Sequence, residues 1–255
     1  MVTGQGSENG AEGSRLVNDE REVATEIVPV PDKPPAGHVW RSATEMHEGR
    51  EFRRRTGFDY EVMVKELVGA AEPLAGARVL NIATGTGFIA RQLSARAGGR
   101  GKVIGIDADP GLVDQARLGA QSAGITLRTD WRVASADRLP FAENEFDVVT
   151  CGTAFHRLPV TEFLKEAQRV LKAGGRLVIA DELKSPAGVL ALWLAAQRGY
   201  DRIVHRDLAD PNEQFFLAEE IVALVSDAGF SQIVVKGLQH RNRRGRVFSL
   251  VRAVK

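Results

Sequence analysis

Hydrophobic and polar residues follow two different rhythms between residues 78 and 180, and these rhythms predict alternating strands and helices. Short apolar runs bounded by turn residues predict strands at 78–83, 102–106, 127–133, 146–151 and 175–180. Apolar residues at helical spacing predict helices at 87–96, 110–122 and 160–172. This alternation is typical of an α/β protein with a doubly wound, mostly parallel sheet and helices on both of its faces.

The C-terminal part of the chain departs from this alternation. A helix is expected at about 217–228, and two strand-like runs follow it at 233–238 and 247–254. Strands joined by so short a connection pair in antiparallel fashion. The sheet is therefore expected to end in an antiparallel C-terminal strand.

The N-terminal part differs in composition from the rest of the chain. Residues 1–36 are rich in Gly, Ser, Glu and Pro, which predicts a flexible tail. Asp59 is placed to cap a helix that runs to about Ala71, after a mixed segment around Trp40. We expect residues 37–255 to form a single domain that begins with this helical segment.

An apolar insertion is expected at about 185–216, between the fifth strand and the last helix. Residues 186–196 are apolar on nearly every side, so a helix there must either bury itself on the sheet or cover a ligand. A pocket walled by Leu and by Trp193 would suit a hydrophobic or aromatic small molecule. The pattern leaves both readings open.

Composition narrows the class of protein and its partners. The chain has 255 residues, of which 44% are hydrophobic, and a formal net charge of +1, so nothing indicates a nucleic-acid partner. Cys151 is the single cysteine, which excludes an intramolecular disulfide and favours a reducing, cytoplasmic compartment. We expect no signal peptide and no membrane span, and the sequence does not predict an oligomeric state.

The most informative motif is a strand that runs into the glycine turn Gly85-Thr86-Gly87. A second apolar strand ends in Asp107, about twenty residues further on. A strand, a glycine turn, a helix and a later carboxylate form the nucleoside-binding half of a Rossmann-like sheet, in which the carboxylate accepts hydrogen bonds from ribose hydroxyls. An adenosine-containing cofactor is therefore expected. Because residues 85–90 fit G-x-G-x-x-[G/A], the motif alone also permits a nicotinamide-dependent oxidoreductase.

Three further blocks carry a more specific resemblance. They are Val-Ile-Gly-Ile-Asp-Ala-Asp-Pro at 103–110, Ala-Ser-Ala-Asp-Arg-Leu-Pro-Phe at 134–141 with Glu-Phe-Asp-Val-Val-Thr at 145–150, and Arg-Val-Leu-Lys-Ala-Gly-Gly-Arg-Leu-Val-Ile at 169–179. From Arg78 to Glu182 the chain resembles the class I S-adenosylmethionine-dependent methyltransferases, in particular the ubiquinone and menaquinone C-methyltransferase group. The resemblance implies methyl transfer to a small acceptor by in-line displacement, leaving S-adenosylhomocysteine.

The same resemblance implies which residues bind the cofactor. Asp107 falls where the family binds the ribose hydroxyls, and Ser135 and Ala136 fall at the adenine edge, with Asp137 able to share that role. Thr150 and Cys151 end a strand at the edge where open α/β sheets bind ligands. The expected cofactor-binding residues are Asn81, Ala83, Thr84, Gly85, Thr86, Gly87, Asp107, Ala108, Ser135, Ala136, Asp137, Thr150 and Cys151.

The chain departs from the family pattern at the start of the glycine loop. Asn81 stands where the family usually has an acidic residue, and Ala83 stands at the usual first glycine. The loss of a negative charge near the expected sulfonium and amino group weakens cofactor binding in this interpretation. The alternative is a methyltransferase-like protein that binds the cofactor without transferring methyl, as a scaffold, regulator or cyclase.

His156 is the candidate catalytic residue. It follows the strand that ends in Cys151, and an imidazole titrates near neutrality, so it suits a general base. A helix-capping or packing role is the alternative. The remaining histidines have no ligand spacing with one another or with Cys151, so no metal site is expected.

Overall fold

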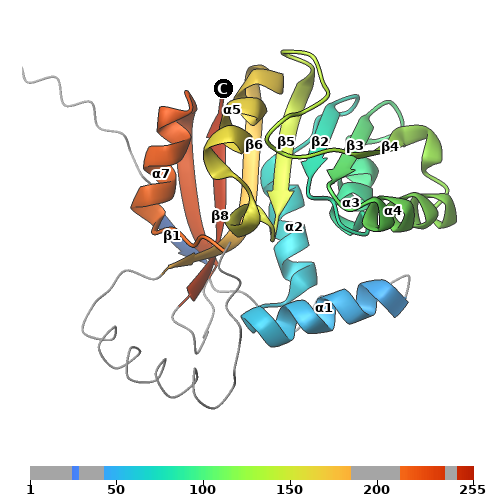
Figure 1. Ribbon diagram of the computed structural model, residues 1–255, viewed down its shortest axis with the longest axis horizontal. Coiled ribbons are helices and arrows are strands. Elements are labelled where there is room, and N and C mark those ends of the chain that lie inside the picture. The colour runs from blue at the N-terminus through green and yellow to red at the C-terminus, as the bar shows by residue number, and fades with distance from the viewer. Residues whose placement is uncertain (1–24, 29–42, 185–212, 239–245) are drawn as a thin grey trace, which may run out of the picture.

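The computed structural model describes residues 25–28, 43–184, 213–238 and 246–255 (Figure 1). Its strands are β1 (Thr25–Val28), β2 (Arg78–Ile82), β3 (Lys102–Asp107), β4 (Thr129–Val133), β5 (Phe146–Gly152), β6 (Leu171–Lys184), β7 (Ser231–Leu238) and β8 (Arg246–Val254). Its α-helices are α1 (Ala43–Thr56), α2 (Tyr60–Ala71), α3 (Phe88–Ala97), α4 (Pro110–Ser122), α5 (Val160–Val170) and α7 (Ala218–Asp227). Two short 3₁₀ turns are η1 (Thr126–Arg128) and η2 (Phe155–Arg157).

The described strands form one eight-stranded sheet in the order β1-β7-β8-β6-β5-β2-β3-β4. Strands β2 to β6 pair in parallel, whereas β8 is antiparallel to both β6 and β7. The Rossmann-like fold with an antiparallel C-terminal strand is therefore confirmed. The chain runs outward from β2 to β4 and then returns to β5 on the other side of β2. Ligands of open α/β sheets bind at such a reversal, beyond the carboxyl ends of the strands.

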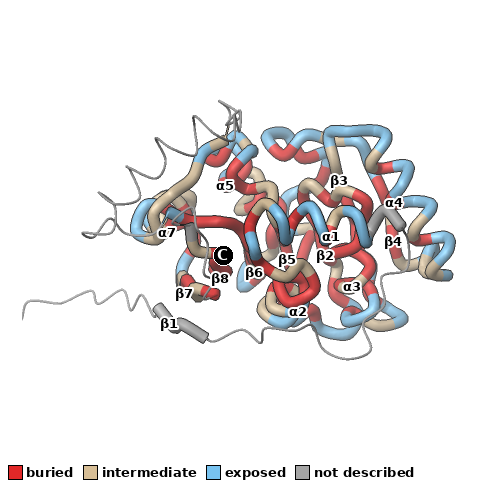
Figure 2. The backbone as a smooth tube through the Cα atoms, turned by 90° about the horizontal axis from the view of Figure 1, so that it is seen from below, coloured by how far each residue is buried: buried red, intermediate tan, exposed pale blue. Residues whose placement is uncertain are grey.

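Both faces of the central strands are buried, because side chains along β2, β3, β5 and β6 are divided between two hydrophobic clusters. On β2, Val79 packs in the cluster beneath α2, α3 and α4, whereas Leu80 and Ile82 pack in the cluster beneath α5 and α7. Figure 2 shows the buried core running through the sheet, with exposed residues along the outer surfaces of the helices. A strand buried on both faces reads as a continuous apolar run, which is why β2, β3 and β5 could be recognised.

Most predicted elements are confirmed, with two differences at boundaries. The Asp59 side chain accepts hydrogen bonds from the backbone N–H groups of Glu61 and Val62, as expected of the cap of α2. Strand β6 extends the predicted strand at both ends. Helix α5 ends at Val170 instead of residue 172, because Leu171 pairs with Phe146 of β5.

Helix α1 was not predicted, and its position matters for the site. Its ring contacts are with α2 and β8: the Phe52 ring lies 5.1 Å from that of Tyr60 and 5.6 Å from that of Phe248. In Figure 1, α1 crosses below α2, at the edge toward which the arrowheads of the parallel strands point. The helix therefore lies along the edge at which a Rossmann-like sheet binds its ligand.

Strand β1 corrects part of one expectation. It lies within the segment 1–36 for which composition predicted a flexible tail, yet Thr25–Val28 pair in parallel with β7. Residues 1–24 and 29–36 lie outside the described residues, as does the predicted helix at 186–196 with nearly all of the insertion. No helix in the described ranges is both long and apolar enough to cross a membrane.

Candidate functional site

The glycine loop that joins β2 to α3 is a tight turn built on left-handed backbone. Gly85 and Gly87 have φ angles of +56° and +82°, and Ala83 itself has a φ of 49°. A Cβ added to Gly87 would lie 2.7 Å from the Trp131 ring and 2.9 Å from the Ala116 side chain. The same addition at Gly85 would meet nothing within 4 Å. Gly87 is thus required both by conformation and by packing, whereas Gly85 is required by conformation alone.

Asn81 is fully buried at the end of β2, and both ends of its amide are used inside the protein. Its Nδ2 donates to the Thr150 hydroxyl at 3.0 Å, and its Oδ1 accepts from the Thr84 hydroxyl at 2.7 Å. A carboxylate at this position could only accept hydrogen bonds. The amide therefore ties the end of β2 to β5 and to the glycine loop, without carrying a charge.

Asp107 lies at the carboxyl end of β3, partly exposed, next to the glycine loop. Its Oδ2 accepts the Gly85 N–H at 2.9 Å, and its Oδ1 accepts the Asp109 N–H at 3.0 Å. The cap of α4 is Asp109, so Asp107 is free of that task. An ionised carboxylate has about four acceptor sites, and two remain for a ligand. Residues with this chemistry fit the ribose hydroxyls of an adenosine cofactor.

Glu48 of α1 reaches the same loop, although the sequence did not indicate it. Its Oε2 accepts a hydrogen bond from the Thr86 hydroxyl at 2.8 Å. Burial raises the pKa of the Glu48 carboxyl above its ordinary value, against the opposing effects of the Thr86 hydrogen bond and of His47. Burial also raises the pKa of the neighbouring Tyr60 phenol, with a contribution from the Glu48 charge. The Thr86 hydroxyl therefore links the glycine loop to α1.

The remaining expected cofactor contacts lie around the ends of β3, β4 and β5. The Ala134 N–H donates to the Asp107 carbonyl at 3.0 Å, which brings the loop after β4 beside β3. In that loop Ser135 and Asp137 are exposed and Ala136 is buried, while Ala108 is exposed beyond β3. The roles of these residues in cofactor binding remain predictions.

Cys151 lies on β5, next to Thr150 and opposite Ile82 of β2. Its side chain is fully buried. Burial raises the pKa of the thiol, and the Asp181 charge raises it further. This environment keeps the thiol protonated, so Cys151 has the properties of an apolar wall residue and not of a nucleophile.

His156 is enclosed in η2, directly after β5. Its Nδ1 lies 2.9 Å from each carboxylate oxygen of Asp181 on β6. Because an ionised carboxylate only accepts hydrogen bonds, Nδ1 carries a proton directed at Asp181. Nε2 lies 3.7 Å from Glu213 Oε1, and the ring stacks on Phe215 at 5.0 Å. The sequence indicated His156 but not these three partners, which come from distant parts of the chain.

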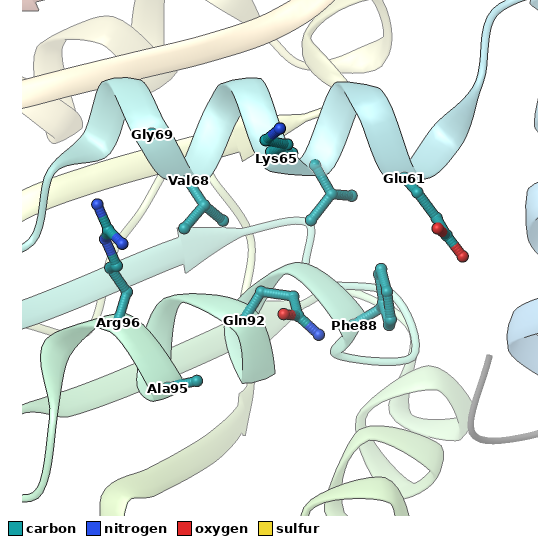
Figure 3. A pocket seen from close by; sticks show the side chains of 9 residues that line it. Glu61, Lys65, Val68, Gly69, Phe88, Gln92, Ala95 and Arg96 are labelled. Atoms are coloured by element: carbon teal, nitrogen blue, oxygen red, sulfur yellow. The ribbon is translucent and has the colours of Figure 1, made fainter. Parts of the chain in front are cut away.

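A separate groove of about 420 Å³ lies between α2 and α3 (Figure 3). It is lined by Glu61, Val64, Lys65, Val68, Gly69, Phe88, Gln92, Ala95 and Arg96. None of the expected cofactor-binding residues lines it, so it is not the candidate site. No cluster of three or more metal-binding side chains occurs in the described ranges, and the absence of a metal site remains a prediction.

Comparison with known proteins bears on the class of protein. A family profile described as a methyltransferase domain matches residues 80–179. The chain is 32% identical over 178 residues to the ubiquinone/menaquinone biosynthesis C-methyltransferase UbiE of Roseobacter denitrificans, covering 65% of this chain and 71% of that protein. It is 33% identical to a demethylmenaquinone methyltransferase of Thermus thermophilus, covering 66% of this chain and 80% of that protein. A crystal structure of an S-adenosylmethionine-dependent methyltransferase from Aquifex aeolicus superimposes with a TM-score of 0.57 at 25% identity, covering 82% of this chain and 95% of that one.

These findings identify the class of enzyme to which the chain belongs. The protein is a class I S-adenosylmethionine-dependent methyltransferase that acts on a small molecule. Within that class, the chain belongs to the family of the ubiquinone and menaquinone C-methyltransferases. The expected cofactor and enzyme class are confirmed, and the nicotinamide-dependent alternative is not supported.

Proposed function

We propose that this protein methylates a ring carbon of a quinone-type aromatic small molecule in its reduced, hydroxylated form. The names of its relatives support this acceptor, since they include a demethylmenaquinone methyltransferase at 33% identity. The observation that best supports cofactor binding at this site is the hydrogen bond from the Gly85 N–H to the Asp107 carboxylate at 2.9 Å. It joins the glycine loop to the carboxylate that we expect to bind the ribose.

The proposed cofactor site extends along the ends of the parallel strands. Asp107 accepts hydrogen bonds from the ribose hydroxyls, and the loop of Ser135, Ala136 and Asp137, with Ala108, borders the adenine. The glycine loop from Ala83 to Gly87 packs its backbone against the ribose and methionine portions. Asn81, Thr84, Thr150 and Cys151 form the floor, and the first three are linked by hydrogen bonds.

S-adenosylmethionine supplies a methyl group that is already activated on a sulfonium sulfur. The protein's task is to hold the acceptor carbon in line with that methyl group, since alignment can supply roughly 7–11 kcal/mol of the barrier. The new bond joins the acceptor carbon to the methyl carbon, the bond from sulfur to methyl breaks, and the ring loses one proton. A group that removes the proton of an acceptor hydroxyl makes the ring carbon more nucleophilic.

We assign that proton transfer to His156. Asp181 fixes its Nδ1–H, which leaves Nε2 as the basic atom. Nε2 is buried 3.7 Å from Glu213 Oε1, so an acceptor hydroxyl reaches it only when Glu213 moves aside. Positioned general bases contribute about 10²–10⁴-fold to rates.

The test is an assay of purified protein with S-adenosylmethionine and a short-chain demethylmenaquinol. S-adenosylhomocysteine should form together with a product that carries one added methyl group on carbon, located by mass spectrometry and NMR. Cofactor that binds tightly but yields no S-adenosylhomocysteine with any aromatic acceptor would favour the reading without methyl transfer. A cytoplasmic location remains a prediction, and cell fractionation tests it.

The role of His156 is tested separately with His156→Asn and Asp181→Asn. Loss of the base should lower kcat about 10²–10⁴-fold in His156→Asn and remove one limb of the pH–rate profile. Asp181→Asn should lower kcat while leaving cofactor affinity intact. If His156→Asn keeps the wild-type rate and pH profile, His156 is a packing residue.

A further inference from the structure

Two threonine hydroxyls on either side of Gly85 fix the glycine loop, and they contact different kinds of partner. The Thr84 hydroxyl donates to the neutral Asn81 amide at 2.7 Å. The Thr86 hydroxyl donates to the Glu48 carboxylate at 2.8 Å. The polar group from β2 is therefore uncharged, whereas the one from α1 is an acid.

The cofactor needs a negative charge in this region. Its methionine portion carries an α-ammonium group, and the family pattern places an acidic residue at position 81. In this chain Asn81 has no charge, and its amide is already bound to Thr84 and Thr150. The strand that usually supplies the charge does not supply it here.

We propose that Glu48 of α1 is the carboxylate that binds the α-ammonium group of S-adenosylmethionine, in place of an acid on β2. This inference rests on the proposed function, because it concerns the same cofactor site. It gives α1 a direct part in cofactor binding, which agrees with its course along the carboxyl edge of the sheet (Figures 1 and 2). Thr86 orients the carboxylate from the loop side.

The environment of Glu48 suits this role. Its carboxylate forms no ion pair with any residue in the described ranges, and His47 is the only cation there that lowers its pKa. Burial raises that pKa despite the Thr86 hydrogen bond and His47, so the charged form is only partly compensated. A partly buried acid whose charge is only partly compensated is stabilised by a ligand that brings a cation. The α-ammonium group of the cofactor is such a counter-ion.

The experiment is calorimetric titration of the full chain with S-adenosylmethionine, S-adenosylhomocysteine and methylthioadenosine. The first two ligands carry the α-ammonium group, and methylthioadenosine lacks the whole amino-acid portion. Glu48→Gln keeps the size of the side chain and its ability to accept from Thr86. Glu51→Gln on the same helix is the matched control, because Glu51 is exposed and bonds to Arg54 at 2.8 Å.

We expect Glu48→Gln to weaken the first two ligands about 10- to 100-fold and equally, the loss typical of a charged hydrogen bond. Methylthioadenosine should bind Glu48→Gln as it binds the wild type, and Glu51→Gln should change none of the three affinities. Unchanged affinities, equal loss for all three ligands, or loss for S-adenosylmethionine alone would each overturn the assignment. Wild-type protein that binds none of the ligands would instead overturn the proposed function itself.

Discussion

Replacement of Gly87 by alanine is the sharpest test of how the glycine loop is held. The change forces a residue with a Cβ into a φ of +82° and places that atom 2.7 Å from the Trp131 ring. Left-handed backbone costs roughly 1–2 kcal/mol for such a residue. Overpacking in a close-packed interior adds roughly 1–3 kcal/mol. Reduced freedom of the unfolded chain offsets about 0.4–1 kcal/mol, which leaves a net loss of about 1–4.6 kcal/mol.

Gly85→Ala is the matched control, because it shares the left-handed backbone but meets nothing within 4 Å. Its expected loss is about 0–1.6 kcal/mol, from conformation alone. In a chain of this size 1 kcal/mol moves Tm by about 2–4 °C, so Gly87→Ala should melt roughly 2–18 °C below wild type. Urea unfolding without ligand gives the free energies directly.

A double-mutant cycle isolates the crowding. Trp131→Phe removes the ring atoms nearest to Gly87, so the pair Gly87→Ala and Trp131→Phe should lose less stability than the two single losses added together. If Gly87→Ala is no worse than Gly85→Ala, or if the double mutant is simply additive, then contact with Trp131 does not fix the loop and the reasoning fails.

Three further predictions concern the same site. Ala83→Gly should leave stability unchanged or raise it by up to about 1 kcal/mol, because Ala83 has a φ of 49°; a clear fall in Tm would contradict this. Glu48→Gln should raise Tm without ligand at pH 7, because the raised pKa of Glu48 means that its charged form destabilises the folded state. This gain in Tm should vanish as the pH falls toward 4.5, the ordinary pKa of the group, where wild-type Glu48 is protonated. Thermal melts across that pH range would refute the idea if the gain persisted. Asp107→Asn should weaken S-adenosylmethionine and methylthioadenosine alike, about 10- to 100-fold by calorimetry, and a loss confined to S-adenosylmethionine would rule out the ribose role.

The sequence predicted features that depend on neighbouring residues. Asp59 was recognised as a cap because its carboxylate and the backbone N–H groups that donate to it lie within three residues of each other. Gly85 and Gly87 were recognised because a tight turn between a buried strand and a helix needs left-handed backbone. In each case the physical cause and its sequence signal occupy the same short stretch.

Features that depend on distant contacts were not predicted. Helix α1 has few apolar residues, and its segment was read as mixed because the charged run at residues 50–55 obscures the helical spacing of Phe52 and Thr56. The bond from Thr86 to Glu48 spans 38 positions and depends on how α1 crosses the sheet edge. Asp181 and Glu213 likewise reach His156 from β6 and from the segment before α7.

The position of Asn81 explains why an acid on α1 is compatible with a stable fold. A carboxylate at position 81 would be fully buried at the end of β2, where the charged form pays the whole cost of desolvation until a cation arrives. The amide avoids that cost and still links β2 to Thr150 and Thr84. Glu48 is only partly buried, on a helix at the rim of the site, so water can solvate part of its charge before the cofactor binds. Moving the charge from strand to helix therefore separates the stability of the sheet from the electrostatics of binding, and the opposite effects expected of Glu48→Gln on Tm and on cofactor affinity follow from that separation.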